Sequence, residues 1–182
     1  MRLVKNVFVV LAVSALLSAC NENNKSEASA KDPVKGLHAL MERLQKSIDA
    51  TEPVISPPSD SLYYTEWYKR KIYTSDKMQF DVVKTNSVVS PFLGKIDFEC
   101  NTRFVKGVNL EEVKDKSFSG TADTPCRVTY AYQEDRWIFK DMSCLKLTAS
   151  NPNDFQEVSS DDTTSVLGQC RVIANSLTSK EK

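Results

Sequence analysis

The chain has 182 residues, with 24 basic and 24 acidic side chains and a single histidine, so its formal net charge is zero. A neutral chain has no general electrostatic attraction for nucleic acid, which argues against that class of partner. A length of this order is typical of one folded domain.

The first twenty residues have the pattern of an export signal. Arg2 and Lys5 precede an apolar run from Val7 to Leu17 that only Ser14 interrupts. This run is too short to cross a bilayer comfortably, which takes about 20 apolar residues. A charged start, a short apolar core and small residues at its end are typical of a secretory signal. The segment Leu17-Ser18-Ala19-Cys20 at its end resembles the lipobox of bacterial lipoproteins.

The lipobox resemblance implies an address and an anchor. Residues 1–19 are then a signal peptide, and Cys20 carries a thioether-linked diacylglycerol and an amide-linked acyl chain such as palmitate, enough for stable anchoring. Asn21 after the cysteine favours the outer membrane, with the protein facing the periplasm. An ordinary cysteine after a plain cleavage site is the alternative. Cleavage removes Arg2 and Lys5, which leaves 22 basic and 24 acidic residues and a net charge of −2.

A tether and then a helix are expected after the signal. Residues 21–31 are polar without a hydrophobic period, which predicts, together with Cys20, a lipidated flexible tether that reaches about 20 Å. Asp32 and Pro33 are favoured at the N-cap and the first position of a helix. Apolar residues then recur at threes and fours as far as Ile48, and residues 51–53 end the helix near Ala50. The stripe is expected to pack on a sheet; a partner-binding or coiled-coil helix is the alternative.

The segment 62–73 combines five aromatic side chains with three consecutive basic ones. Such clusters bind membrane interfaces or single-stranded nucleic acid, but aromatic residues also build strands and core edges. The periodicity does not decide between a strand and a short helix, and a structural role is favoured over a surface for a membrane or a partner. The candidate binding surface comprises Tyr64, Trp67, Tyr68, Lys69, Arg70 and Lys71.

The chain from Met78 onward is predicted to be mostly β, with about four strands. Strands are expected around 80–83, 96–104, 126–132 and 137–147, with a hairpin turn at 133–136. In the second strand Ile96, Phe98, Cys100 and Phe104 share one face and polar residues the other. Residues 106–125 are expected to form a long polar loop and 151–163 another. Residues 166–177 predict a last helix, with 161–163 as its cap.

Four cysteines remain besides Cys20, and an even number in an exported chain indicates two disulfides. They are widely spaced, unlike the close pairs of a zinc site. Strand parity places Cys100 and Cys126 on the apolar faces of their strands and Cys144 opposite the face of Trp137. The predicted pairs are therefore Cys100–Cys126 and Cys144–Cys170, and a bulge in any strand would overturn this parity.

The order of elements predicts an α+β domain over residues 32–182, in which an amphipathic N-terminal helix packs on a curved antiparallel sheet. Three phrases, at residues 80–85, 90–94 and 132–139, look like strand and hairpin segments of cystatin-like and NTF2-like exported domains. This resemblance implies a fold with a helix across a sheet, and implies no activity.

The sequence carries no recognised catalytic motif, and no cofactor, metal site or catalytic residue is predicted. His38 is expected to be solvated on the first helix, and adjacent acidic pairs occur only in polar stretches, at 111–112, 134–135 and 161–162. The leading hypothesis is a non-catalytic envelope lipoprotein that binds another envelope protein, as an assembly, pilot or exclusion factor, through the sheet face, the loop 106–125 or the segment 62–73. The alternative is a carrier of a small apolar ligand, with its pocket between the helix and Tyr130, Tyr132 and Trp137.

Overall fold

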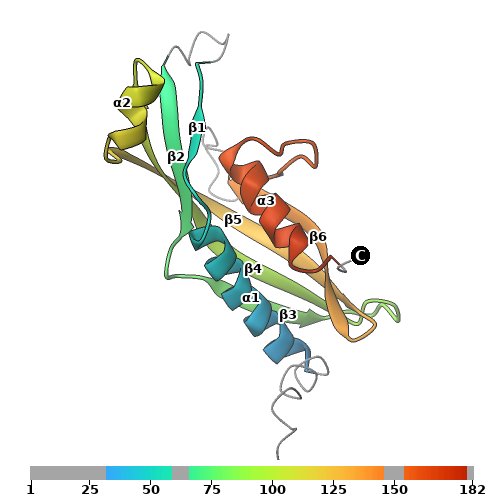
Figure 1. Ribbon diagram of the computed structural model, residues 1–182. Coiled ribbons are helices and arrows are strands. Elements are labelled where there is room, and N and C mark those ends of the chain that lie inside the picture. The colour runs from blue at the N-terminus through green and yellow to red at the C-terminus, as the bar shows by residue number, and fades with distance from the viewer. Residues whose placement is uncertain (1–31, 59–65, 146–153, 180–182) are drawn as a thin grey trace, which may run out of the picture.

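The computed structural model describes residues 32–58, 66–145 and 154–179. The export signal, Cys20, the predicted tether and Tyr64 lie outside these residues. The described chain is α+β: the helices α1 (Pro33–Asp49) and α3 (Val166–Ser176) lie across one face of a curved antiparallel sheet, and the short helix α2 (Leu110–Asp115) lies at one end (Figure 1). The predicted fold class and the two longer helices are thereby confirmed, but Ser165 caps α3 in place of the predicted residues 161–163.

Seven strands form the sheet, in the order β1-β2-β4-β5-β6-β7, and β3 also pairs with β4. β2 and β3 pair with successive parts of β4, so they lie end to end along one edge of it. The prediction of about four strands is wrong, because β1 and β7 have only three residues each and β2 has no clear period. The elements are α1 (Pro33–Asp49), β1 (Val54–Ser56), β2 (Trp67–Thr74), β3 (Gln79–Lys84), β4 (Phe92–Gly107), α2 (Leu110–Asp115), β5 (Gly120–Gln133), β6 (Arg136–Leu145), β7 (Phe155–Glu157) and α3 (Val166–Ser176).

Helix α1 begins and ends where its sequence predicts. The Asp32 carboxylate accepts hydrogen bonds from the backbone N–H groups of Val34 and Lys35, which satisfies two of the donors that a helix start leaves free. Ala50 is its C-cap. Its apolar stripe is buried against the sheet and α3, so the expected packing role is confirmed; the buried side chains are Leu37, Leu40, Leu44 and Ile48.

A bulge in β6 changes which side chains face the core. Tyr130 of β5 pairs with Phe139, whereas the preceding Thr129 pairs with Asp141, so Lys140 has no direct partner in the ladder. One extra residue in a strand reverses the face of every side chain beyond it. The alternation of buried positions in β6 is therefore broken at the exposed Lys140.

The predicted disulfide pairs are wrong for this reason. Beyond the bulge, Cys144 shares the buried face with Trp137 rather than opposing it, and it lies directly across from Cys126. Cys126 and Cys144 form a disulfide, with their Cα atoms 4.0 Å apart. Cys100 and Cys170 are free thiols, and both are buried.

The β5–β6 hairpin turns through two residues in an unusual conformation. Glu134 and Asp135 have φ angles of 49° and 58°, which only glycine adopts without a steric penalty. Replacing Glu134 with Asn and Asp135 with Gly should therefore raise the free energy of unfolding by about 1 kcal/mol, because Asn-Gly suits this turn. Urea unfolding of the double variant and of the wild type measures the change, and an unchanged or lower stability would contradict it.

Candidate binding surface

The aromatic and basic residues of β2 are divided between two faces of the sheet. Side chains alternate along a strand, so Trp67, Lys69 and Lys71 point to the face opposite to Tyr68 and Arg70. All five are half-buried. The five described residues of the candidate surface therefore do not share one face, and the contacts of Lys69, Tyr68 and Arg70 show what these three do.

Lys69 holds the C-terminal end of α2 against the sheet. Its ammonium group donates hydrogen bonds to the backbone oxygens of Lys114, at 2.8 Å, and Lys116, at 2.5 Å. It also lies 5.2 Å from the centre of the Phe118 ring. A cation at the carbonyl end of a helix is stabilising, so Lys69 has a structural role rather than a free binding role.

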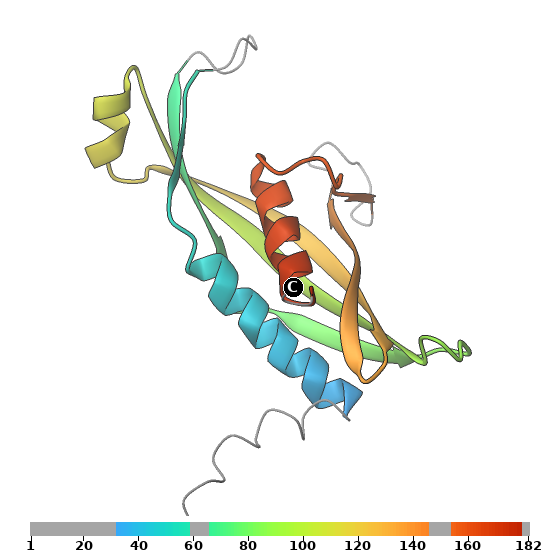
Figure 2. The same cartoon turned by 45° about the vertical axis from the view of Figure 1, so that its right-hand side comes forward.

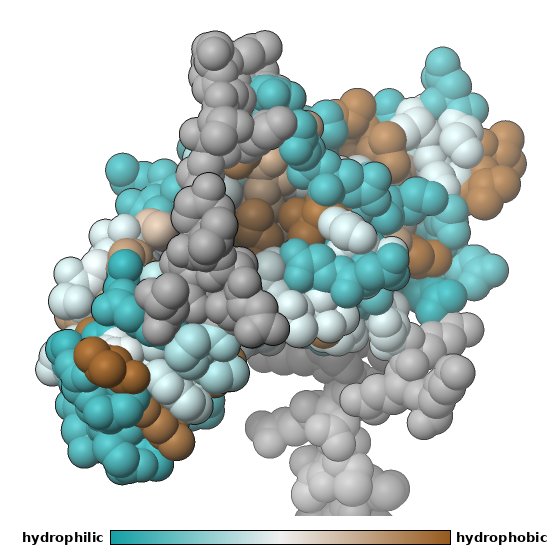
Figure 3. All heavy atoms as spheres, turned by 90° about the horizontal axis from the view of Figure 1, so that it is seen from above, coloured by the Kyte–Doolittle hydropathy of each residue, from teal (hydrophilic) through white to brown (hydrophobic). Residues whose placement is uncertain are grey.

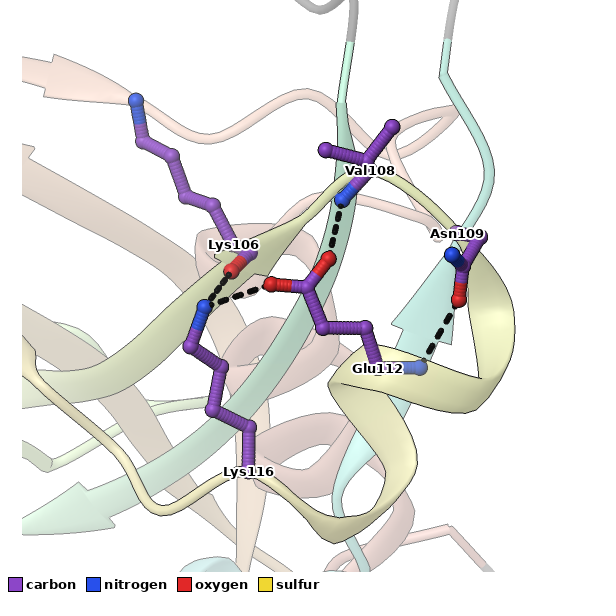
Figure 4. Close-up of polar contacts among 5 residues, drawn as sticks. All are labelled: Lys106, Val108, Asn109, Glu112 and Lys116. Carbon is purple, nitrogen blue, oxygen red and sulfur yellow. Dashed lines mark hydrogen bonds and ion pairs between the residues drawn. The ribbon is translucent and has the colours of Figure 1, made fainter.

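The start of α2 is fixed by its own side chains (Figure 4). The Asn109 side-chain oxygen accepts a hydrogen bond from the Glu112 backbone N–H at 2.9 Å, and the Glu112 carboxylate accepts one from the Val108 N–H at 2.8 Å. Lys116 pairs with the same carboxylate at 2.9 Å, and these contacts lower the pKa of Glu112, with the Lys116 hydrogen bond as the largest cause. The expected loop at 106–125 thus contains a helix, whose buried Val113 covers Gly107.

The opposite face of β2 is also tied to its neighbours. The Lys106 ammonium group lies 5.5 Å from the centre of the Tyr68 ring and 3.5 Å from the Glu66 carboxylate. A hydrogen bond with Tyr68 is the largest cause of the raised pKa of Lys106. Arg70 donates a hydrogen bond to the Ser56 hydroxyl of β1 at 2.9 Å. These contacts join β1, β2 and β4 at this end of the sheet.

A second surface lies on the sheet face that α1 and α3 leave open. Binding through a sheet face was among the expectations, but its residues were not predicted. We call it the open sheet face and define it by Tyr73, Asp97, Arg103, Arg127 and Phe155. The Arg103 guanidinium lies 4.7 Å from the centre of the Tyr73 ring. The Arg127 guanidinium lies 5.3 Å from the Phe155 ring and binds both oxygens of Asp97, at 2.6 and 3.2 Å.

The hydrogen bond that Arg127 donates to the Asp97 carboxylate raises the pKa of Arg127, so this guanidinium stays charged. Beside it lies an open hollow of about 190 Å³, lined in part by Gln79, Pro125 and Phe155. The hollow lies at the gap between β2 and β3, which pair with successive parts of β4. The open sheet face therefore combines two aromatic–arginine pairs with a recess between strands.

The space that a small ligand would need between α1 and the sheet is filled with side chains. Tyr130, Tyr132 and Trp137 are all buried. A Cβ atom on Gly94 would lie within 3 Å of both Leu37 and Trp137, so no room is left there. The described residues thus offer no observation in support of the small-ligand alternative.

Tyr130 predicts a loss of stability at alkaline pH. Burial raises its pKa well above 10, against the opposing charge of Arg43, and its hydroxyl donates a hydrogen bond to the Ala174 oxygen. The unfolded chain loses this proton near pH 10 while the folded chain keeps it. The contribution is complete below that pH, and stability falls above it by up to about 1.4 kcal/mol per pH unit.

Urea unfolding at about pH 9 and about pH 11 tests this linkage in the wild type and in Tyr130→Phe. The variant cannot ionise at this position, so its alkaline loss of stability should be the smaller one. Equal losses in the two proteins would contradict the prediction.

Cys100 and Cys170 bring two thiols together beside the Cys126–Cys144 disulfide. A hydrogen bond with Cys100, followed by burial, raises the pKa of the Cys170 thiol well above its ordinary value. Cys100 lies on β4 and Cys170 on α3, so their contact joins the sheet to the last helix. The Cys170 thiol is therefore protonated near neutral pH and reacts slowly unless an oxidant reaches it.

The remaining polar residues of interest have local partners. His38 is exposed on α1, as predicted, and its ring nitrogen lies 3.8 Å from the Glu42 carboxylate. Asp162 accepts hydrogen bonds from the backbone and side chain of Ser165, and these lower its pKa. In the part of the chain that the structure describes, no three His, Cys, Asp or Glu side chains are grouped so that they hold a metal ion.

None of the helices within residues 32–58, 66–145 and 154–179 is long and apolar enough to cross a membrane. Comparison of the chain with protein-family models, with curated proteins and with solved structures finds no match in any of the three.

Proposed function

We propose that the protein is a lipid-anchored component of the bacterial envelope that binds another envelope protein and performs no catalysis. The segment Leu17-Ser18-Ala19-Cys20 after a short apolar run carries the anchor and the address. Two or more acyl chains on Cys20 hold a protein stably on a membrane. Asp32 caps the first described helix, and residues 21–31 separate it from Cys20 in the sequence.

The open sheet face supports the protein-binding part of the proposal. Arginine and aromatic side chains are enriched in protein interfaces and among the residues that contribute most to binding. Tyr73 with Arg103 and Phe155 with Arg127 present both kinds of side chain on one face, and the second pair lines a recess. Lys69 and Arg70 of the predicted surface are occupied by contacts within the fold, and Arg127 is bound by Asp97, so the proposed contact depends most on Tyr73, Arg103 and Phe155.

Site-specific photo-crosslinking in living cells tests the partner surface. A photoreactive amino acid at Tyr73 or Phe155 should give the same crosslinked species, and one at the exposed Glu42 on the helical face should not. Arg103→Ala should weaken the crosslink from Phe155, while Lys140→Ala, an exposed change on β6, should leave it unchanged. No crosslink from either site, or an equal one from Glu42, would refute the proposed surface.

Intact mass of the membrane-extracted protein tests the anchor. The expected mass is that of residues 20–182 with a diacylglycerol and an acyl chain. Cys20→Ser should yield a protein without lipid that no longer sediments with membranes. An unmodified mass for the wild type would refute the anchor and the address together.

We further propose that Cys100 and Cys170 form a second disulfide in the exported protein. Their contact supports this pairing, and disulfides persist in oxidising compartments. The step is an exchange with a disulfide of an oxidising enzyme: the two thiols give up two protons and two electrons, and the donor disulfide is reduced to two thiols. Peptide mapping without reduction should link the peptide of Cys100 to that of Cys170; a link from either to Cys126 or Cys144 would refute the pairing.

A further inference from the structure

The β3–β4 loop, residues 85–91, presents the most exposed hydrophobic side chain among those described. Val88 is 97% exposed and Val89 is 71% exposed. Figure 3 shows hydrophobic side chains at the right-hand extremity of the molecule, where this loop projects. Two adjacent valines kept in water are unfavourable by themselves, so a contact that removes them from water would be favourable.

The loop is held in shape by its own polar groups. The Thr85 N–H donates to the Pro91 oxygen at 2.8 Å, the Ser87 N–H to the Thr85 hydroxyl at 3.1 Å, and the Ser90 N–H to the Ser87 hydroxyl at 3.1 Å. The serine and threonine side chains are thus turned back into the loop. The valines between them remain as an ordered, outward-facing apolar tip.

This tip lies at the end of the molecule where α1 begins. Gln133 of the β5–β6 hairpin donates a hydrogen bond to the Ser90 hydroxyl at 2.6 Å, and Trp137, just beyond the hairpin, donates one to the Pro33 oxygen at 3.1 Å. Figures 1 and 2 both show the β3–β4 loop, the hairpin and the start of α1 at the same end, away from α2.

We propose that this end faces the bilayer that carries the lipid anchor, and that Val88 and Val89 enter the interfacial region of that bilayer. The inference rests on the proposed lipidation of Cys20. If residues 21–31 form the predicted tether of about 20 Å, the anchor keeps the tip close to the lipid and makes the contact intramolecular.

The charges around the tip set the depth of this contact. Lys84 is exposed at the same end, where it favours anionic headgroups, whereas the exposed Lys35 lies 3.6 Å from the Asp32 carboxylate. Glu134 and Asp135 are also exposed there and resist entry into the hydrocarbon. The contact is therefore interfacial and limited to the valine tip, and α2 at the other end points away from the membrane.

Tryptophan scanning with the lipidated full chain tests this orientation. Val88→Trp is incorporated into vesicles of phosphatidylethanolamine and phosphatidylglycerol, with and without a phospholipid brominated near the headgroup end of its chains. Val108→Trp, 79% exposed beside α2, is the matched control. Emission of wild-type protein, from Trp67 and Trp137, is subtracted from both.

The emission of Val88→Trp should shift to shorter wavelength on the vesicles and be quenched by the brominated lipid, whereas that of Val108→Trp should do neither. Intact mass of each preparation confirms lipidation first. Lipidated protein in which Val88→Trp is unquenched, or in which Val108→Trp is quenched equally, overturns the orientation alone. Protein without lipid overturns the proposed anchor instead, so the two failures are distinguishable.

Discussion

Replacing Cys100 and Cys170 together with alanine should lower the free energy of unfolding of the oxidised protein by about 4 kcal/mol. A disulfide between them would close the chain from residue 100 to residue 170, and a longer loop loses more entropy in the unfolded state when it is closed. Replacing Cys126 and Cys144, which are separated by 18 residues, should cost about 3 kcal/mol. Urea unfolding of the two double variants and of the wild type measures both effects.

The same measurement in excess reductant is the control for this prediction. Without disulfides, the wild type and the Cys100/Cys170 variant should differ only by the smaller packing effect of two buried thiols, both nearly inaccessible to solvent. A variant that is equally destabilised with and without reductant would mean that the two cysteines stabilise the fold as thiols and are not linked.

Trp137→Ala should be the most damaging single substitution in the core, with a loss of about 4 kcal/mol in the free energy of unfolding. The indole ring packs edge-on against Tyr132, with 5.1 Å between the ring centres. Together with Leu37 it fills the space next to Gly94. Its N–H also binds the Pro33 oxygen, so the substitution both opens a cavity and releases the start of α1.

Trp137→Phe separates these two contributions, because phenylalanine retains most of the ring volume but cannot donate the hydrogen bond. Its expected cost is about 1–2 kcal/mol, since the bond is worth about 1 kcal/mol and some volume is lost. Chemical denaturation measures both variants. A loss below about 1 kcal/mol for Trp137→Ala would show that the first turn of α1 and the hairpin are not coupled through this residue.

Local signals explain which elements the sequence predicts. α1 carries its N-cap, its proline and its apolar stripe within one stretch, so no knowledge of the rest of the fold is needed. β4 alternates buried and exposed side chains between Lys95 and Cys100 as expected, because one face lies on the core and the other is open. Both predictions depend only on spacing along the chain.

Long-range contacts explain which elements it does not predict. The bulge at Lys140 comes from the register of β6 against β5, and nothing in the local sequence marks it. α2 has six residues and is stable because Val113 is buried and Lys69 binds its last turn, both of which are tertiary contacts. A short helix in a polar segment therefore reads as a loop.

The candidate surface shows the same limit. Composition marked Lys69 and Arg70 as unusual, but the fold uses both of them internally. The arginine–aromatic pairs of the open sheet face join Tyr73 to Arg103 and Arg127 to Phe155, from strands that are distant in sequence. Only the register of the sheet brings them together.

The short strands β1 and β7 at the two ends of the sheet have a consequence for crowding. A lipid anchor confines copies of a protein to two dimensions, where sheets with long exposed edges pair with one another and aggregate. In the described residues, β1 and β7 offer only three residues each, and the free edge of β3 carries Asp81 and Lys84. The long strands β4 and β5 lie inside the sheet. On the proposed lipid anchor, these short and charged edges would limit pairing between neighbouring copies, which leaves the uncovered parts of β2 and β6 as the edges open to it.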